Sequence, residues 1–269
     1  RGDRTGAFRV DDLDPVQVRL LGIRGGKRAY AEEHIWNMKI ASRLPMIGAR
    51  VNTAVGAIQE MDIALDVSGG DSFTDMYPGP RMRWIAGGKE LVLDMGVPLV
   101  LLPQTFGPFG KSLGRATRIV RRSRMCWARD ERSFETLRSM LGPEFDSDRH
   151  RCGVDMAFGL VPRNANESLD ARLRDFLSDP TTPVLGLNLS GLVGLNHQVA
   201  VQQYGFKADY FAAMKAFVER VLGENHARVV LVPHVMSLPH TGESDVEICR
   251  KLERALSPEL RERVAISPT

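Results

Sequence analysis

Short apolar runs alternate with helix-like stretches along most of this chain. Such alternation indicates βα units and parallel sheets. The expected strands span residues 62–68, 97–103, 124–128, 184–190, 228–233 and 263–267. The expected helices span residues 80–95, 111–122, 131–141, 167–178, 208–223 and 243–256. The early strands are nearly continuous apolar runs, which predicts a sheet covered on both faces.

A polar, proline-containing stretch at residues 161–182 separates two groups of these βα units. The full length of 269 residues is enough for one large domain or two modest ones. We interpret the chain as two Rossmann-like parallel-sheet domains. The first spans residues 1–160, the second spans residues 183–269, and residues 161–182 form the junction.

Composition narrows the class of protein. Hydrophobic residues make up 43% and charged residues 26%, as in ordinary soluble globular proteins. No apolar stretch approaches the ~20 residues of a membrane span. The net charge of +3 does not indicate a nucleic-acid partner. Cys126, Cys152 and Cys249 are far apart and lack metal-ligand spacing, so we expect a reduced, cytoplasmic setting and no metal site.

Three polar loops follow apolar runs in the first domain, where parallel sheets bind ligands. The first is Ser68-Gly69-Gly70-Asp71. Its glycines allow a sharp turn and a close approach to a ligand. Asp71 is placed to orient a sugar hydroxyl or to act as a base. The alternative interpretation of this motif is a plain βα turn with an Asp cap.

The second loop is Gln104-Thr105-Phe106-Gly107-Pro108. The amide of Gln104 and the hydroxyl of Thr105 suit a polar ligand. The proline pushes Gly107 away from helical conformation, so a tight structural turn is the alternative.

The third loop contains Arg129, Asp130 and Ser133 at the start of an expected helix. A helix N-terminus attracts anions, and Arg129 can hold a carboxylate or phosphate through two hydrogen bonds. Asp130 is a good N-cap. The alternative is an Arg–Asp ion pair at the cap, and the sequence does not decide between them.

Two strand ends of the second domain are also polar. His234 ends one strand, and Asn188 and Ser190 end another. A histidine at this position is suited to donate a proton or bind an anion near neutral pH. A lone histidine is equally well explained as structural.

A basic stripe runs at helical spacing through Lys111, Arg115, Arg118 and Arg122. It suits contact with an anionic membrane surface or a lipid diphosphate, although a solvated helix face is the commoner explanation.

The order GGD, LPQTFGP, ARDERS and then a strand ending in PHV resembles the polysaccharide pyruvyl transferase family over residues 62–245. The resemblance implies a two-domain fold similar to GT-B glycosyltransferases. It also implies transfer of a pyruvyl group from phosphoenolpyruvate to a lipid-linked or nucleotide-linked sugar of a cell-surface or exopolysaccharide precursor, with formation of a pyruvate ketal. No cofactor is implied beyond this donor substrate.

The resemblance suggests roles for the residues singled out above. Asp71 and His234 become the candidate catalytic residues. The candidate substrate-binding residues are Gly69, Gly70, Gln104, Thr105, Gly107, Arg129, Asp130, Ser133, Asn188 and Ser190.

This sequence also departs from the family pattern. Asp71 stands where many members have a third glycine, and the family's Arg-x-His motif, associated with phosphoenolpyruvate, is not found before Thr269. We therefore expect a truncated second domain, and Arg1-Gly2-Asp3 as the remnant of an amino-terminal loop. Two alternatives remain: a GT-B nucleotide-sugar glycosyltransferase, and a non-catalytic subunit of polysaccharide assembly.

Overall fold

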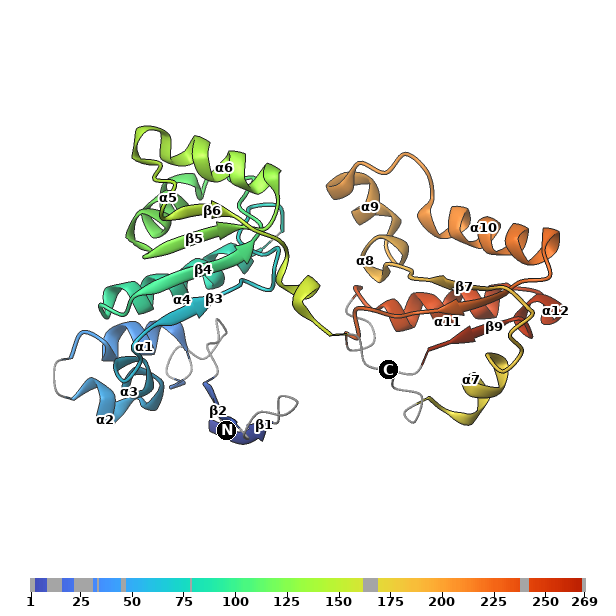
Figure 1. Cartoon of the computed structure of the whole chain (residues 1–269), viewed down its shortest axis with the longest axis horizontal. Coiled ribbons are helices and arrows are strands. Elements are labelled where there is room, and N and C mark those ends of the chain that lie inside the picture. Colours follow the sequence, from blue (N-terminus) through green and yellow to red (C-terminus); the bar gives the residue numbers. More distant parts are fainter. Residues whose placement is uncertain are drawn as a thin grey trace. The chain divides into compact units, whose positions relative to one another are not determined.

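The computed structural model describes residues 3–8, 16–21, 31–32, 34–44, 47–77, 79–161, 169–237 and 242–267. The chain divides into two compact units, Arg1–Val161 and Pro162–Thr269, called here the amino-terminal and carboxyl-terminal units (Figure 1). The expected α/β class with parallel sheets is confirmed. Residues 162–168 of the expected junction, and Arg1 and Gly2, lie outside the described residues.

The amino-terminal unit contains a parallel sheet of order β3-β4-β5-β6. The strands are β3 (Ala64–Asp66), β4 (Leu99–Gln104), β5 (Met125–Ala128) and β6 (His150–Cys152). The connecting helices are α4 (Arg81–Asp94), α5 (Leu113–Arg122) and α6 (Glu131–Leu141), followed by the short η1 (Gly142–Glu144). We did not predict the three-residue strand β6.

One face of this sheet carries the main core. Leu99 and Leu101 of β4 are buried in one core with Cys126 and Ala128 of β5 and with residues of α4, α5 and α6. On the other face, Leu65 of β3 and Val67, which directly follows this strand, are 61% and 37% exposed. The expectation that both faces are covered is therefore wrong for β3 in this structure.

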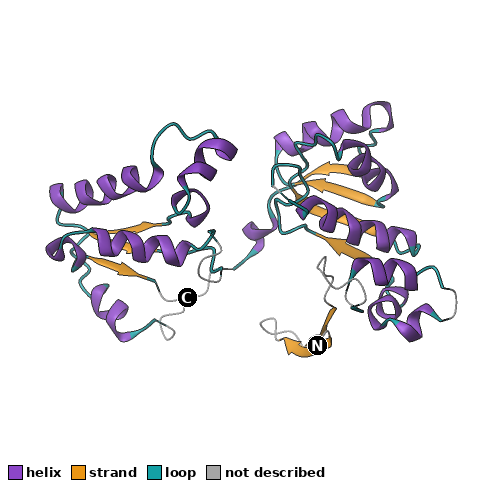
Figure 2. Ribbon diagram, turned by 180° about the vertical axis from the view of Figure 1, so that it is seen from behind, coloured by secondary structure: helices purple, strands orange, loops and turns teal. Residues whose placement is uncertain are grey.

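Five elements near the amino terminus were not predicted. An antiparallel pair is formed by β1 (Asp3–Phe8) and β2 (Val16–Leu21). The helices α1 (Ile35–Ala41) and α3 (Thr53–Gln59) share a core with Leu91 of α4, and α2 (Gly48–Val51) contacts α1 and α3. Helices and strands of each unit are distinguished by colour in Figure 2. Gly48 and Gly56 weaken the helical signal, because glycine is a poor helix former. At Gly48 the fold needs glycine, since a Cβ there would overlap the carbonyl oxygen of Ala41.

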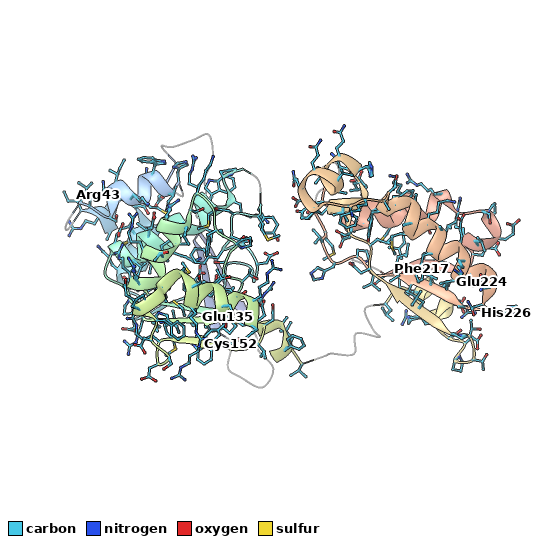
Figure 3. The ribbon with its side chains drawn as sticks, turned by 90° about the horizontal axis from the view of Figure 1, so that it is seen from above. Arg43, Glu135, Cys152, Phe217, Glu224 and His226 are labelled. Atoms are coloured by element: carbon cyan, nitrogen blue, oxygen red, sulfur yellow. The ribbon has the colours of Figure 1, made fainter. Side chains whose placement is uncertain are left out.

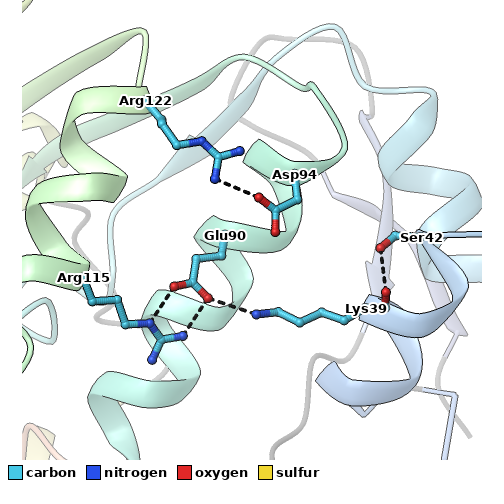
Figure 4. Close-up of polar contacts among 6 residues, drawn as sticks. All are labelled: Lys39, Ser42, Glu90, Asp94, Arg115 and Arg122. Atoms are coloured by element: carbon cyan, nitrogen blue, oxygen red, sulfur yellow. Dashed lines mark hydrogen bonds and ion pairs between the residues drawn. The ribbon is translucent and has the colours of Figure 1, made fainter.

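Glu90 of α4 joins the helices on either side of it (Figure 4). Its carboxylate accepts from Lys39 Nζ at 2.9 Å and from Arg115 Nε and Nη2 at 2.6 and 2.7 Å. The hydrogen bonds from Arg115 are the main cause that lowers the pKa of Glu90 to about 2. Arg122 pairs with Asp94 at 2.7 Å. Two members of the predicted basic stripe are thus engaged in ion pairs inside this unit.

The carboxyl-terminal unit holds a second parallel sheet of order β7-β8-β9. Its strands are β7 (Val184–Leu187), β8 (Arg228–Leu231) and β9 (Val264–Ile266). Its helices are α7 (Ala171–Phe176), α8 (Gly191–Gly194), α9 (His197–Tyr204), α10 (Tyr210–Glu224), α11 (Asp245–Ala255) and α12 (Pro258–Arg261). The short helices α8, α9 and α12 were not predicted. In the described ranges, no helix is long and apolar enough to cross a bilayer.

Candidate functional site

The three predicted loops of the amino-terminal unit meet at the carboxyl edge of its sheet. Thr105 N donates to Gly70 O at 2.8 Å, which ties the loop after β4 to the loop after β3. Arg129 N donates to Gln104 O at 3.1 Å, which ties the loop after β5 to the same group. Parallel strands place their carboxyl ends together, and here backbone hydrogen bonds hold the loops in contact. Gly70, Thr105 and Arg129 therefore belong to one site.

The loop after β3 turns through three consecutive left-handed residues. Ser68, Gly69 and Gly70 have φ angles of 49°, 60° and 84°. Only glycine adopts this region without strain, so the two glycines are required by the turn. A Cβ on Gly70 would lie 3.3 Å from Arg129 Nη1. The missing side chain thus lets the guanidinium approach the backbone.

A buried lysine bonds to the residues at the start of this loop. Lys89 of α4 is 2% exposed, and its ammonium lies 2.6 Å from Asp66 Oδ1 and 2.5 Å from Ser68 Oγ. Ser68 Oγ also donates to Asp66 Oδ1 at 2.8 Å. Burial lowers the pKa of Lys89, while the Asp66 carboxylate opposes that effect. This ion pair fixes Ser68, the one non-glycine residue of the turn.

Gln104 lies beneath the loops rather than at their surface. Its side chain is fully buried, and Nε2 donates to Asp66 O at 3.1 Å. Gln104 Oε1 and Thr105 Oγ1 are buried without a hydrogen-bond partner among the described residues. The amide therefore positions the loop after β3.

Asp71 is half-buried at the top of the same loop. Its carboxylate accepts from the hydroxyl of Tyr77, and from Ser72 Oγ at 3.2 Å. The carboxylate is thus already oriented by hydroxyl groups. An ionised carboxylate in such a position can accept the proton of a further hydroxyl.

Gly107 is fixed by packing. Its φ is 71°, and a Cβ there would lie 3.0 Å from Thr136 Cγ2 and 3.1 Å from Phe109 N. Its N–H donates to Phe73 O at 3.0 Å. Among the candidate residues, Gly107 thus serves the shape of the loop, as the interpretation of a tight turn expects.

Arg129 forms an ion pair across the edge of the sheet. Its Nη1 lies 2.8 Å from Asp155 Oδ2, and its Nε lies 3.6 Å from Asp130 Oδ2. Asp155 precedes the short helix η2 (Met156–Gly159). Its pKa is lowered chiefly by the backbone N–H of Ala157, with Arg129 adding to the effect. The Arg129 side chain is 28% exposed, so it is oriented by acids yet partly open to solvent.

The cap of α6 uses the other two residues of this loop. Asp130 Oδ1 accepts from Ser133 N at 2.7 Å, which confirms the predicted N-cap. Ser133 is 3% exposed. Its backbone is engaged in the cap and its side chain is buried in the first turn.

A buried carboxylate organises the carboxyl edge of the second sheet. Asp245, 3% exposed at the start of α11, accepts from Gly191 N at 2.7 Å, Val235 N at 2.8 Å and His234 N at 3.1 Å. Burial raises the pKa of Asp245, but these backbone hydrogen bonds outweigh it and lower the pKa. Asp245 therefore sets the path of the loops after β7 and β8.

The predicted residues of the carboxyl-terminal unit lie around this carboxylate. Asn188 Nδ2 donates to Val232 O at 2.8 Å and lies 3.4 Å from Asp245 Oδ2. Ser190 N donates to the hydroxyl oxygen of Tyr210 at 3.1 Å. His234 is exposed. The structure thus brings Asn188 and His234 to one carboxylate.

Four residues of these sites were missing from the predicted set: Asp66, Lys89, Asp155 and Asp245. Asp66 ends the apolar run before the first predicted loop, and Asp155 lies three residues after the end of β6. The signal for Lys89 is its place in the apolar register of α4, seven residues after Met82 and three after Ala86, both buried. A lysine in that register is almost always paired.

The sites suit anions and hydroxyl groups. In the part of the chain that the structure describes, no group of three or more His, Cys, Asp or Glu side chains is placed to hold a metal ion. The guanidinium of Arg129 is a donor at the edge of the first sheet, and the carboxylate of Asp71 is an acceptor there.

Comparison with known proteins gives one positive result. No curated protein matches the chain. The family model described as polysaccharide pyruvyl transferase matches residues 9–268. This match extends beyond the 62–245 range of the motifs and covers nearly all of both units. The chain therefore belongs to the polysaccharide pyruvyl transferase family.

Proposed function

We propose that this protein transfers a pyruvyl group from phosphoenolpyruvate to a sugar of a cell-surface or exopolysaccharide precursor, forming a pyruvate ketal. The observation that carries the proposal is the family match over residues 9–268. The finer expectations of the resemblance are proposed with it: a GT-B-like fold, a lipid-linked or nucleotide-linked sugar acceptor, and a reaction in the cytoplasm that needs no further cofactor.

The donor carries a carboxylate and a phosphate, so its site needs cations. Arg129 is the candidate, because it lies among the loops at the sheet edge and its side chain is 28% exposed. The pair with Asp155 engages Nη1 and fixes the direction of the guanidinium. A guanidinium has five N–H donors, and those not directed at Asp155 can bind an oxyanion.

Ketal formation joins two sugar hydroxyl oxygens to one carbon of the donor, breaks the bond from that carbon to the phosphate oxygen, and adds a proton to the methylene carbon. Of the two hydroxyl protons, one goes to the methylene carbon and one leaves with phosphate. We propose that Asp71 accepts a hydroxyl proton and that His234 donates the methylene proton or binds the phosphate. Positive charge develops at the attacked carbon, where a carboxylate stabilises it.

The test is thermal unfolding with phosphoenolpyruvate, with 2-phosphoglycerate as an anion of similar charge that lacks the enol, and with a panel of nucleotide sugars. Ligand at about 100 times its dissociation constant should stabilise the fold by about 2.7 kcal/mol. We expect the largest shift with phosphoenolpyruvate, and phosphate release once an acceptor is added. A shift with a nucleotide sugar alone, accompanied by transfer of that sugar, would identify a glycosyltransferase instead. No shift with any ligand would favour a non-catalytic subunit.

A further inference from the structure

The outer surface of α1 and α2 exposes five large apolar side chains. They are Trp36, Ile40, Leu44, Ile47 and Val51, with 66%, 60%, 43%, 56% and 57% of their surface exposed. Single exposed apolar residues are common on proteins, but a group of this size within one short segment marks an interaction surface. These five residues are called the outer apolar face below.

The helical period explains why this face points outward. Trp36 and Ile40 are four residues apart and share one side of α1. Met38 and Ala41 lie on the opposite side, buried in a core with Leu91 of α4. The inner residues thus join α1 to α4, and the outer residues lie on the side turned away from that core.

The start of α2 lies close to the end of α1. Gly48 N donates to Leu44 O at 3.0 Å, so the start of α2 is bonded to the turn that follows α1. Ile47 and Val51 are again four residues apart and share one side of α2. The two short helices thus present their apolar residues from one compact segment.

Residues 34–59 carry charges of a single sign, and a carboxylate lies at their edge, where Glu32 Oε1 accepts from Thr53 N at 2.5 Å. Between Glu33 and Glu60 the sequence contains Lys39, Arg43 and Arg50 and no Asp or Glu. Lys39 reaches Glu90 at 2.9 Å, whereas Arg43 and Arg50 are exposed. Arg43 lies at the periphery of the amino-terminal unit (Figure 3). Apolar residues with interspersed cations are typical of helices that lie in a membrane interface.

We propose that the outer apolar face docks on a lipid bilayer that carries anionic headgroups. The five apolar side chains would enter the boundary between headgroups and acyl chains, with Trp36 at the level that suits its amphipathic ring. Arg43 and Arg50 would contact lipid phosphates, since basic residues beside an apolar face are attracted to anionic surfaces. This proposal rests on the surface alone and not on the proposed reaction.

Charge also decides against a second copy of the same face. Two copies would bring Arg43 and Arg50 toward their counterparts, and this stretch of sequence offers no carboxylate to pair with them. Like charges facing each other across an interface are unfavourable. A bilayer supplies the missing anions at any orientation.

Vesicle co-sedimentation of the whole chain tests the proposal. One set of vesicles contains phosphatidylcholine alone, and the other contains equal parts of phosphatidylcholine and phosphatidylglycerol. We expect binding to the anionic vesicles that weakens as salt is added, because the Debye length shortens. We also expect a blue shift of tryptophan emission on binding, and its loss in Trp36→Phe, which keeps an apolar ring.

Two double variants separate the apolar and cationic contributions. Trp36→Ser/Ile40→Ser should lower binding to anionic vesicles by about tenfold or more. Arg43→Gln/Arg50→Gln should lower it by about fivefold for each arginine and reduce its salt dependence. The matched control is Phe217→Ser on α10, a large apolar residue 44% exposed in the other unit (Figure 3). The control should bind as the unaltered chain does.

Three outcomes would overturn the proposal. The first is absence of binding to anionic vesicles by the folded chain. The second is binding that Phe217→Ser weakens as much as Trp36→Ser/Ile40→Ser does. The third is concentration-dependent self-association in sedimentation velocity that Trp36→Ser/Ile40→Ser abolishes while vesicle binding is unchanged, which would assign the face to a second copy. None of these outcomes bears on phosphoenolpyruvate binding, so failure here is distinguishable from failure of the proposed function.

Discussion

The ammonium of Lys89 lies 2.6 Å from the carboxylate of Asp66, with 1% of the lysine side chain exposed and 29% of the aspartate. The pair therefore joins a fully buried cation to a carboxylate that still reaches water. Because Ser68 bonds to both groups, the pair supports the left-handed turn that brings Gly70 beside Arg129. The local fold and the candidate donor site depend on the same contact.

The asymmetry of this pair predicts unequal effects of removing its two members. Asp66→Ala leaves a buried cation without its partner, which should lower the free energy of unfolding by about 3–5 kcal/mol. Lys89→Met removes the cation and keeps the volume, and the remaining carboxylate can be hydrated, so the loss should stay below about 1.5 kcal/mol. Urea unfolding followed by tryptophan fluorescence measures both, since Trp36, Trp84 and Trp127 all lie in the amino-terminal unit.

Equal losses of unfolding free energy in the two variants would contradict the predicted asymmetry between Asp66 and Lys89. If the hydrogen bond from Lys89 to Ser68 positions the donor site, Lys89→Met should also weaken phosphoenolpyruvate binding while the protein remains folded.

Alanine substitutions at two glycines with similar φ angles can separate the effect of backbone strain from the effect of a steric contact with Arg129. Gly70 and Gly79 have φ angles of 84° and 77°, and a Cβ meets Arg129 Nη1 at Gly70 but nothing within 4 Å at Gly79. Gly70→Ala and Gly79→Ala should each lower stability by about 1–2 kcal/mol, the strain of a left-handed residue. Only Gly70→Ala should also weaken phosphoenolpyruvate binding, as measured by calorimetry. Equal binding by both variants would remove Gly70 from the site.

The proposed function makes a direct prediction for Arg129 and His234. Arg129→Ala removes the guanidinium and leaves Asp155 partly hydrated, so phosphoenolpyruvate affinity should fall by about tenfold or more, with the fold retained. His234→Ala removes an exposed side chain while its backbone bond to Asp245 persists, so a similar loss is expected if the imidazole binds the phosphate. Calorimetry and circular dichroism check both. Unchanged affinity, or loss of the folded state, would withdraw the assignment for that residue.

Glu90 predicts an acid dependence of stability. Its pKa is lowered to about 2 from an ordinary 4.5, mainly by hydrogen bonds from Arg115. A carboxyl group with a lowered pKa in the folded state stabilises the fold above its unfolded pKa and loses that contribution as pH falls through the folded pKa. Stability of the amino-terminal unit should therefore decline between about pH 4.5 and pH 2, by on the order of 3 kcal/mol from this residue. Urea unfolding at a series of pH values measures it.

The matched control for Glu90→Gln is Glu144→Gln, which breaks the exposed pair of Glu144 with Arg121 at 2.6 Å. Glu90→Gln should flatten the decline between pH 4.5 and pH 2, and Glu144→Gln should leave it nearly unchanged, since exposed pairs contribute little. A decline that is identical in both variants would assign it to other carboxyl groups.

Asp245 makes a prediction for the carboxyl-terminal unit. Asp245→Asn replaces one carboxylate oxygen by an amide that donates rather than accepts, so a buried N–H of Gly191, His234 or Val235 loses its partner. The expected cost is about 1–3 kcal/mol. Far-ultraviolet circular dichroism should show an earlier unfolding phase, while tryptophan fluorescence, which reports on the other unit, should not move. A change of fluorescence with no change of circular dichroism would contradict this assignment.

The periodicity of the sequence was sufficient to predict most of both sheets. Six strands lie within or close to the expected ranges: β3, β4, β5, β7, β8 and β9. A short run of apolar residues between turn signals is typical of a buried strand. Strand β6 and helices α8 and α12 are only three or four residues long. Elements of that length have no period to detect, and pairing and packing with distant residues decide them.

The loops show most clearly which features local sequence predicts and which depend on tertiary contacts. The letters Ser68-Gly69-Gly70 predicted a sharp turn, and Asp130 predicted a helix cap, because both depend on local backbone chemistry. The partners of Arg129 and Asp245 depend on residues 26 and 54 positions away in the sequence, at Asp155 and Gly191. Nothing local specifies such contacts.

The sequence by itself determined the fold class, the places where its loops turn, and the family resemblance, since each is written in short-range pattern. The tertiary structure alone decided that Lys89 is buried against Asp66, that Asp155 orients Arg129, that Asp245 gathers the loops around His234, and that α1 exposes Trp36. The physical reason is that burial, ion pairing and desolvation are set by which distant side chains share a space. That arrangement follows from the packing of helices on the two sheets.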